Sequence, residues 1–98
     1  MKMVEGGLQR KERRHKLQIY YDILVAIQQE TTAEGGARPT RIQHLSNMSY
    51  DKLVRYLDEL VEKEMISRGE TLVLTDKARE FLRDYEKVKD LIERMGLE

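Results

Sequence analysis

The sequence predicts a mainly α-helical domain with one small β-hairpin. Apolar residues recur at spacings of three and four along most of the chain, which is the period of an amphipathic helix. Charged residues make up 37% of the 98 residues, an enrichment typical of solvent-facing helices and coiled coils. Between residues 66 and 74 this period gives way to two short β-prone runs on either side of a glycine. A chain of this length is expected to hold a single core.

The first fifteen residues form a basic segment that we expect to be a flexible arm. Residues 1–16 hold six lysines and arginines against two glutamates, whereas the whole chain is neutral with 18 residues of each sign. Two adjacent glycines and the lack of an apolar period before Leu17 indicate flexibility. Such an arm either contacts DNA or is only a solvated tail, and its candidate DNA contacts are Arg13 and Arg14.

The first predicted helix begins at Leu17 and ends between Gln29 and Thr32. Its expected buried face consists of residues spaced three and four apart, namely Leu17, Tyr20, Ile23, Leu24 and Ile27. The residues that follow are polar and glycine-rich, and the only proline, Pro39, comes shortly after them. We therefore expect a loop at residues 31–36.

Two helices joined by a tight turn are expected next. Thr40 is placed to cap a short helix over residues 41–45. Residues 46–49 then form a turn whose last residue, Ser49, caps a longer helix at residues 50–64. The core face of this longer helix is expected to consist of Leu53, Leu57, Leu60 and Val61. Its opposite face is free for a partner.

A β-hairpin follows, with strands at residues 66–68 and 71–74. Gly69 and Glu70 separate the strands, and a glycine at the first central position suits a type II′ turn. After the hairpin, Thr75 is placed to cap the last helix.

The last predicted helix, at residues 76–95, carries a heptad pattern of apolar residues. Near Phe81 and Leu82 it is expected to pack on its own domain. Its later apolar residues need a partner, because leaving them in water forfeits roughly 1.5 to 3 kcal/mol per large side chain. We therefore predict a homodimer whose interface consists of Phe81, Tyr85, Val88, Leu91, Ile92 and Met95.

This order of elements is the layout of a winged helix-turn-helix domain at residues 16–75, followed by a dimerisation helix at residues 76–98. In that layout the helix at residues 50–64 enters a DNA major groove and the hairpin is the wing. From residue 51 to residue 64 this helix carries five acidic residues against three basic ones, so only its N-terminal turns favour DNA. Arg55 is the candidate base reader, since arginine to guanine is the commonest specific contact. The other candidate contacts are Arg38, Thr40, Arg41, Ser49, Tyr50, Lys52 and Arg68.

Three segments of the chain resemble a known family. They are KLQIYYDILVAI at residues 16–27, PTRIQHLSNMSYDKLVRYLDELVEKEMI at residues 39–66 and LVLTDKAREFL at residues 72–82. The most specific motifs in them are Thr40-Arg41-Ile42, Asn47-x-Ser49-Tyr50 and Leu74-Thr75-Asp76-Lys77. These segments are similar to the small archaeal winged-helix DNA-binding proteins that end in a coiled-coil helix, the Sso-ten-a type of chromatin or transcription-regulator protein. The resemblance implies an antiparallel coiled-coil homodimer, with a winged-helix domain at each end and double-stranded DNA as partner.

Several classes of function find no support in the sequence. The absence of cysteine removes disulfides, thiolate metal sites and thiol catalysis. His15 and His44 have no ligand partners at metal-binding spacing, and the chain holds neither a nucleotide-binding glycine motif nor a nucleophilic triad. The longest apolar run is far too short for a membrane span, and the N-terminus has no signal-peptide core. We expect a cytoplasmic protein that is not an enzyme, with no cofactor, membrane contact or small-molecule substrate.

The sequence leaves two classes of function open. As a DNA-binding protein, the dimer is either a sequence-selective transcription regulator or an architectural, nucleoid-associated protein. Alternatively, the same fold uses its acidic helix and apolar stripes as a protein–protein interaction module without DNA binding, which the neutral overall charge favours. Salt separates the two classes, because phosphate contacts weaken steeply with ionic strength and apolar contacts do not.

Overall fold

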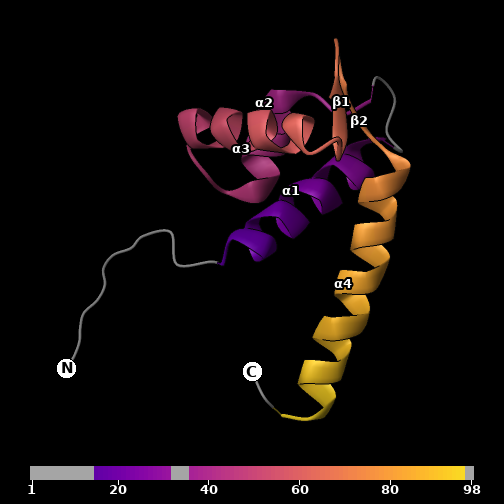
Figure 1. Ribbon diagram of the computed structural model, residues 1–98. Coiled ribbons are helices and arrows are strands. Elements are labelled where there is room, and N and C mark those ends of the chain that lie inside the picture. The colour runs from indigo at the N-terminus through magenta and orange to yellow at the C-terminus, as the bar shows by residue number, and fades with distance from the viewer. Residues whose placement is uncertain (1–14, 32–35, 97–98) are drawn as a thin grey trace, which may run out of the picture.

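The computed structural model describes residues 15–31 and 36–96, so the prediction of a basic arm, including Arg13 and Arg14, lies almost entirely outside the described residues. The described chain is mainly α-helical with one two-stranded antiparallel hairpin, as the sequence predicts (Figure 1). Its elements are α1 (Lys16–Thr31), α2 (Pro39–Ser46), α3 (Tyr50–Glu62), β1 (Ile66–Arg68), β2 (Leu72–Leu74) and α4 (Asp76–Arg94).

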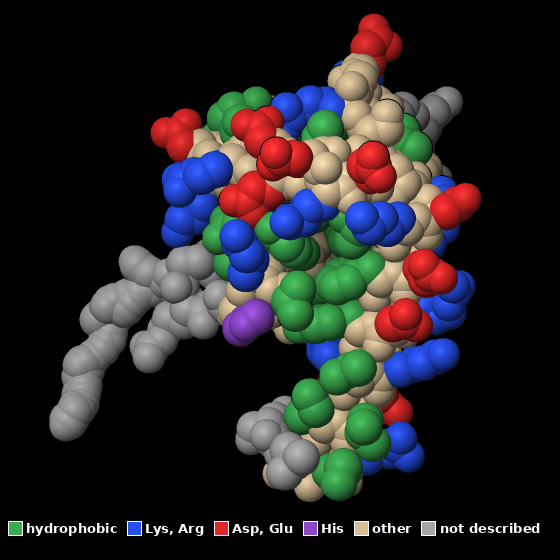
Figure 2. Space-filling view, in the orientation of Figure 1, with side chains coloured by type: hydrophobic (Ala, Val, Ile, Leu, Met, Phe, Trp, Pro, Cys, Tyr) green, Lys and Arg blue, Asp and Glu red, His purple; other side chains and the backbone are tan. Residues whose placement is uncertain are grey.

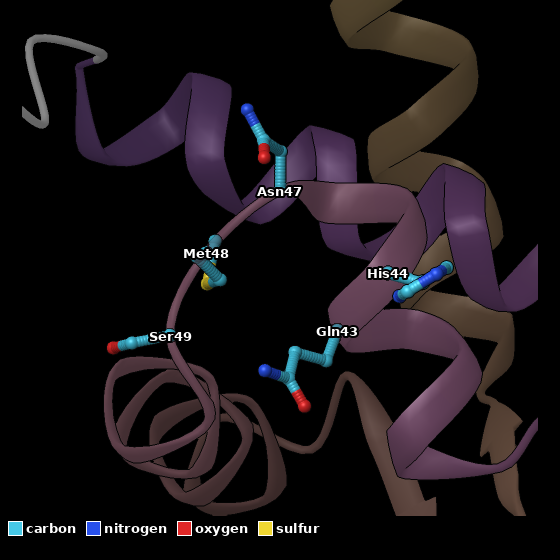
Figure 3. A pocket seen from close by; sticks show the side chains of 5 residues that line it. All are labelled: Gln43, His44, Asn47, Met48 and Ser49. Carbon is cyan, nitrogen blue, oxygen red and sulfur yellow. The ribbon is translucent and has the colours of Figure 1, made fainter.

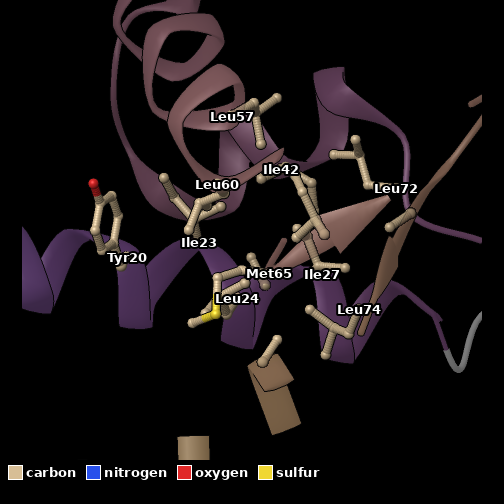
Figure 4. Packing of buried hydrophobic residues seen from close by; sticks show 14 of the residues in the cluster. Tyr20, Ile23, Leu24, Ile27, Ile42, Leu57, Leu60, Met65, Leu72 and Leu74 are labelled. Carbon is tan, nitrogen blue, oxygen red and sulfur yellow. The ribbon is translucent and has the colours of Figure 1, made fainter. Parts of the chain in front are cut away.

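The hydrophobic core is built around α1, which packs against α2, β2 and α4. Figure 4 shows side chains of α1 meeting those of α2, α3 and the hairpin. Burial of each large side chain stabilises the fold by about 1.5 to 3 kcal/mol. The predicted face of α1 is confirmed except at Leu17, which is 44% exposed, whereas Ile19 is buried. The buried face is centred on Ile23 and Ile27, so it includes Ile19 and leaves Leu17 at its border.

The predicted helix pair is present, but α2 begins earlier than expected. Arg38 is the N-cap residue with extended backbone, and Pro39 is the first helical residue, where the missing N–H of proline costs nothing. The prediction that Thr40 caps α2 is therefore wrong, because Thr40 lies within the first turn. The prediction for Ser49 is confirmed, since its hydroxyl accepts a hydrogen bond of 3.2 Å from the backbone N–H of Lys52.

A tight reversal ends α3 at Glu62, two residues before the predicted end. Glu64 has a left-handed backbone with a φ of 62°. The backbone N–H groups of Glu64 and Met65 donate to the carbonyls of Val61 and Leu60 at 3.0 and 2.8 Å, which is a Schellman motif. Val61 was predicted to lie in the core and is 37% exposed, because it lies at the border of the buried stripe of α3.

The hairpin has a different register from the one predicted. Ile66 pairs with Leu74 and Arg68 pairs with Leu72, so the connecting loop has three residues. Gly69 is not among the described residues with positive φ. The type II′ turn, which requires positive φ at that position, is therefore wrong. The register follows from burial, because Ile66, Leu72 and Leu74 all face the core.

A third segment joins the hairpin through a single bridge. The N–H of Leu72 donates to the carbonyl of Ala37 at 2.7 Å. Beside it, Gly36 has a φ of +76°, and a Cβ atom there would lie 3.2 Å from the side chain of Thr71. A glycine therefore suits both the backbone and the close approach. A one-residue bridge has no alternating pattern, so the sequence did not predict it.

The last helix, α4, starts at its predicted cap, where the Thr75 hydroxyl accepts a hydrogen bond of 3.2 Å from the N–H of Ala78. Phe81 and Tyr85, two predicted dimer contacts, are half-buried on their own domain, and the ring of Tyr85 lies 5.0 Å from that of Tyr21 in α1. Glu86 and Lys89 also contact Tyr21 of α1, and beyond them α4 runs away from the other elements (Figure 1). The large apolar side chains of this end are exposed by 37 to 62%, and they are Val88, Leu91, Ile92 and Met95.

Candidate nucleic-acid interface

The exposed face of α3 carries the main candidate DNA contacts. The buried stripe on the other side fixes the rotation of the helix. This rotation leaves Arg55 exposed, Tyr50 47% exposed and Lys52 half-buried. Neither Lys52 nor Arg55 forms an ion pair with a carboxylate of the described residues. Both side chains are therefore available to an anionic partner, and the positive end of the α3 helix dipole lies beside them.

An open hollow lies at the turn between α2 and α3. It is lined by Gln43, His44, Asn47, Met48 and Ser49, which Figure 3 shows around the turn. The amides of Gln43 and Asn47 and the imidazole of His44 are hydrogen-bond groups of the kind that bind phosphate oxygens. These three residues were not among the predicted contacts, which near this turn were Ser49 and Tyr50. The available signal was their position directly before and within the turn predicted at residues 46–49.

The wing is joined to α3 by an ion pair. The guanidinium Nη1 of Arg68 in β1 lies 2.7 Å from Oδ1 of Asp58 in α3, and both side chains are partly exposed. This contact holds Arg68 beside α3, as the predicted interface requires. It also balances the charge of Arg68. An exposed pair of this kind is worth only about 0.2 to 1 kcal/mol, so exchanging the carboxylate for a phosphate costs little.

The candidates at the start of α2 lie on the surface but differ in their partners. Arg38 and Thr40 are exposed, and Arg38 forms no ion pair within the part of the chain that the structure describes. Arg41 instead lies 3.3 Å from Oε1 of Glu30 in α1. Four of the predicted contacts lie at the start and in the first half of α3, and they are Ser49, Tyr50, Lys52 and Arg55. Arg68 of the wing lies beside Asp58 in the second half of the same helix.

A second polar contact ties α3 to α1. The Tyr20 hydroxyl donates a 2.5 Å hydrogen bond to Oε1 of Glu59, and the ammonium of Lys16 lies 3.4 Å from the same oxygen. The hydrogen bond from Tyr20, with the charge of Lys16, lowers the pKa of Glu59. Burial raises the pKa of Tyr20, and Glu59 raises it further. The carboxylate is therefore charged at neutral pH and already partnered.

Charge on the surface of α3 is mixed. Figure 2 shows acidic and basic side chains interleaved over this helix, without a single basic patch. The acidic residues of its second half include Asp58 and Glu59, which already pair with Arg68 and Lys16. Its first two turns carry Lys52 and Arg55 against a single acidic residue. The N-terminal half of α3 is thus the part that suits phosphate.

Within the described ranges, no group of three or more potential metal ligands occurs. No helix in the same residues is long and apolar enough to cross a membrane.

No curated protein sequence matches the chain. A family model described as winged helix-turn-helix matches residues 13–93, which include the helix pair, the hairpin and almost all of α4. The order of elements and this match show that the chain belongs to the winged helix-turn-helix family.

Proposed function

We propose that this protein binds double-stranded DNA, with α3 in the major groove and the β1–β2 hairpin against the adjacent backbone. The observation that carries the proposal is the first half of α3, where exposed Arg55 and half-buried Lys52 have no ion-pair partner among the described residues. Membership of the winged helix-turn-helix family supports the same function.

The candidate contacts have different roles in this proposal. Arg55 reads a base edge, because a guanidinium near the middle of the free face has the reach and geometry to bind guanine. Ser49, Tyr50 and Lys52 bind phosphates and fix the position of the helix. Arg38 and Thr40, together with Arg41 and Arg68 after they leave their carboxylates, bind phosphates on either side.

The proposed protein is a homodimer through α4. Its exposed stripe of Val88, Leu91, Ile92 and Met95, with Phe81 and Tyr85 at the edge, offers an apolar surface to a second copy. An antiparallel pairing, as in the Sso-ten-a type of archaeal protein, would place one winged-helix domain at each end. The dimer would then act in the cytoplasm as a transcription regulator or as a nucleoid-associated protein.

A protein–protein interaction module is the alternative. The observation in its favour is that three basic side chains are already paired, two of them with carboxylates of α3 through Arg68–Asp58 and Lys16–Glu59, and one between α2 and α1 through Arg41–Glu30. In this alternative the acidic half of α3 and the apolar stripe of α4 bind another protein.

Fluorescence anisotropy of a labelled mixed-sequence duplex at several salt concentrations tests the proposal. We expect affinity to fall steeply with salt, with a log-log slope of about 0.9 for each phosphate contact. Arg55→Ala should weaken binding, by about 1 to 3 kcal/mol on a duplex that contains its preferred base. Arg83→Ala, at an exposed arginine of α4, is the matched control and should change little. A chain that binds no duplex at low salt would favour the interaction module, and equal weakening on every duplex would contradict base reading by Arg55.

A further inference from the structure

A hollow of about 530 Å³ lies where the start of α1, the end of α3 and the start of α4 meet. Apolar side chains form its walls, and they are Leu17, Tyr20, Met65 and Phe81. Three lysines complete the lining, Lys16, Lys63 and Lys77. On the face shown in Figure 2, hydrophobic side chains gather between α1 and α4, with basic side chains along their border. A volume of this size is within the range of small-molecule sites.

The described carboxylates balance the charge of this hollow only in part. Lys16 lies 3.4 Å from Glu59. The ammonium of Lys77 donates to the backbone carbonyl of Lys63 at 2.8 Å, a neutral acceptor that leaves its charge in place. Neither Lys63 nor Lys77 forms an ion pair with a carboxylate of the described residues. The charge of Lys63 also lowers the pKa of Glu59, so this one carboxylate faces two of the three lysines and positive charge remains in excess beside the apolar surface.

We propose that this hollow binds an organic anion with an apolar body, such as an aromatic carboxylate or sulfonate. The side chains of Leu17, Met65 and Phe81 cover the body of the ligand, and the ammonium groups hold its anionic head. A neutral ligand would form no ion pair with the lysines, and an inorganic anion would leave the apolar walls exposed to water. Both halves of the lining therefore select the same chemical class.

A ligand in this hollow contacts groups that also hold α3. Lys16 and Tyr20 both bind Glu59 of α3. An anion that draws Lys16 away from Glu59 changes the contact between α1 and α3, so the ligand and a partner of α3 become linked. This consequence rests on the proposed DNA binding, whereas the binding of the anion does not.

The experiment titrates the full chain with 8-anilinonaphthalene-1-sulfonate, whose fluorescence rises in apolar sites, and with the uncharged N-phenyl-1-naphthylamine. We expect saturable binding of the sulfonate at one site per chain. The uncharged probe should bind about 2- to 30-fold more weakly, because it makes no charged contact with the ammonium groups of Lys63 and Lys77. Lys63→Gln should weaken the binding of the sulfonate by up to about 5-fold. Leu17→Ser should weaken the binding of both probes, because it removes an apolar contact. Leu17 is 44% exposed, so its replacement leaves the core intact.

Two control variants fix the location of the probe. Lys87→Gln, at an exposed lysine of α4 outside the hollow, should leave the affinity unchanged. Arg83→Gln, at an exposed arginine of α4 outside the hollow, should also leave it unchanged. Equal affinity for the two probes, no effect of Lys63→Gln, or loss of binding in either control variant would overturn the proposal. A fall in affinity as the protein concentration rises would also overturn it, since a second copy of the chain would then occupy the hollow.

Discussion

Replacing Asp58 by asparagine is expected to strengthen DNA binding while it weakens the fold slightly. The ion pair of 2.7 Å between Arg68 and Asp58 is lost, and both side chains are partly exposed. An exposed pair contributes about 0.2 to 1 kcal/mol. We therefore expect Tm to fall by about 1 to 8 °C for a domain of this size. The released Arg68 no longer has to leave a carboxylate before it contacts phosphate. The affinity for duplex should then rise by up to about 5-fold for each subunit, whereas the salt slope should stay the same, because Arg68 contacts phosphate in both proteins.

The assay compares wild type and Asp58→Asn by duplex anisotropy at several salt concentrations, together with thermal melts. Asp90→Asn is the matched control, because it releases Arg94 from a 3.3 Å pair near the end of α4. It also removes one negative charge, so a general charge effect would appear in both variants. Unchanged affinity in Asp58→Asn, or an equal gain in Asp90→Asn, would refute the idea that Arg68 contacts the DNA backbone.

Three further predictions concern the dimer, the α1–α3 contact and the end of α3. Ile92→Asp should raise the dimer Kd at least about 30-fold, because each of two subunits loses 1 kcal/mol or more of apolar burial, and sedimentation equilibrium would detect this. Tyr20→Phe should cost about 1.5 kcal/mol of unfolding free energy in denaturant melts. The pKa of Glu59 is lowered in the folded chain, so the contribution of Glu59 to the free energy of unfolding is present above its ordinary pKa. This contribution is lost as pH falls through the folded pKa. Tyr20→Phe should therefore make the free energy of unfolding less dependent on acid pH. Glu64→Gly should raise stability by about 0.5 to 1 kcal/mol, because it relieves the left-handed backbone at φ 62°.

Most of the fold could be predicted from the sequence because apolar residues recur at spacings of three and four along α1, α3 and α4. The caps at Ser49 and Thr75 were predictable too, since each is a hydroxyl residue directly before an apolar period. The errors arose where two local signals competed. At the start of α2, Pro39 favours the first helical position more strongly than Thr40 favours the cap. In the hairpin, burial of Leu72 and Leu74 sets the register and overrides the preference of Gly69.

The candidate interface was predictable in its residue types but not in its pairings. The sequence alone predicts charged residues near the start of a helix, and it predicted Lys52 and Arg55 in α3 in this way. The contact of Arg68 with Asp58 depends on the rotation of α3 and on the exact hairpin register, which local sequence does not specify. The lysine-rimmed hollow likewise gathers residues from α1, from α4 and from the segment between α3 and β1. Only tertiary packing brings such residues together.

The most direct test of DNA binding by α3 and the wing is a titration of the isotope-labelled full chain with a mixed-sequence duplex, followed by amide chemical shifts. We predict that the largest shifts occur at residues 43–56, which include the turn hollow and the first half of α3, and at residues 67–72 of the wing. Shifts confined to α4, or no shifts at low salt, would contradict the account.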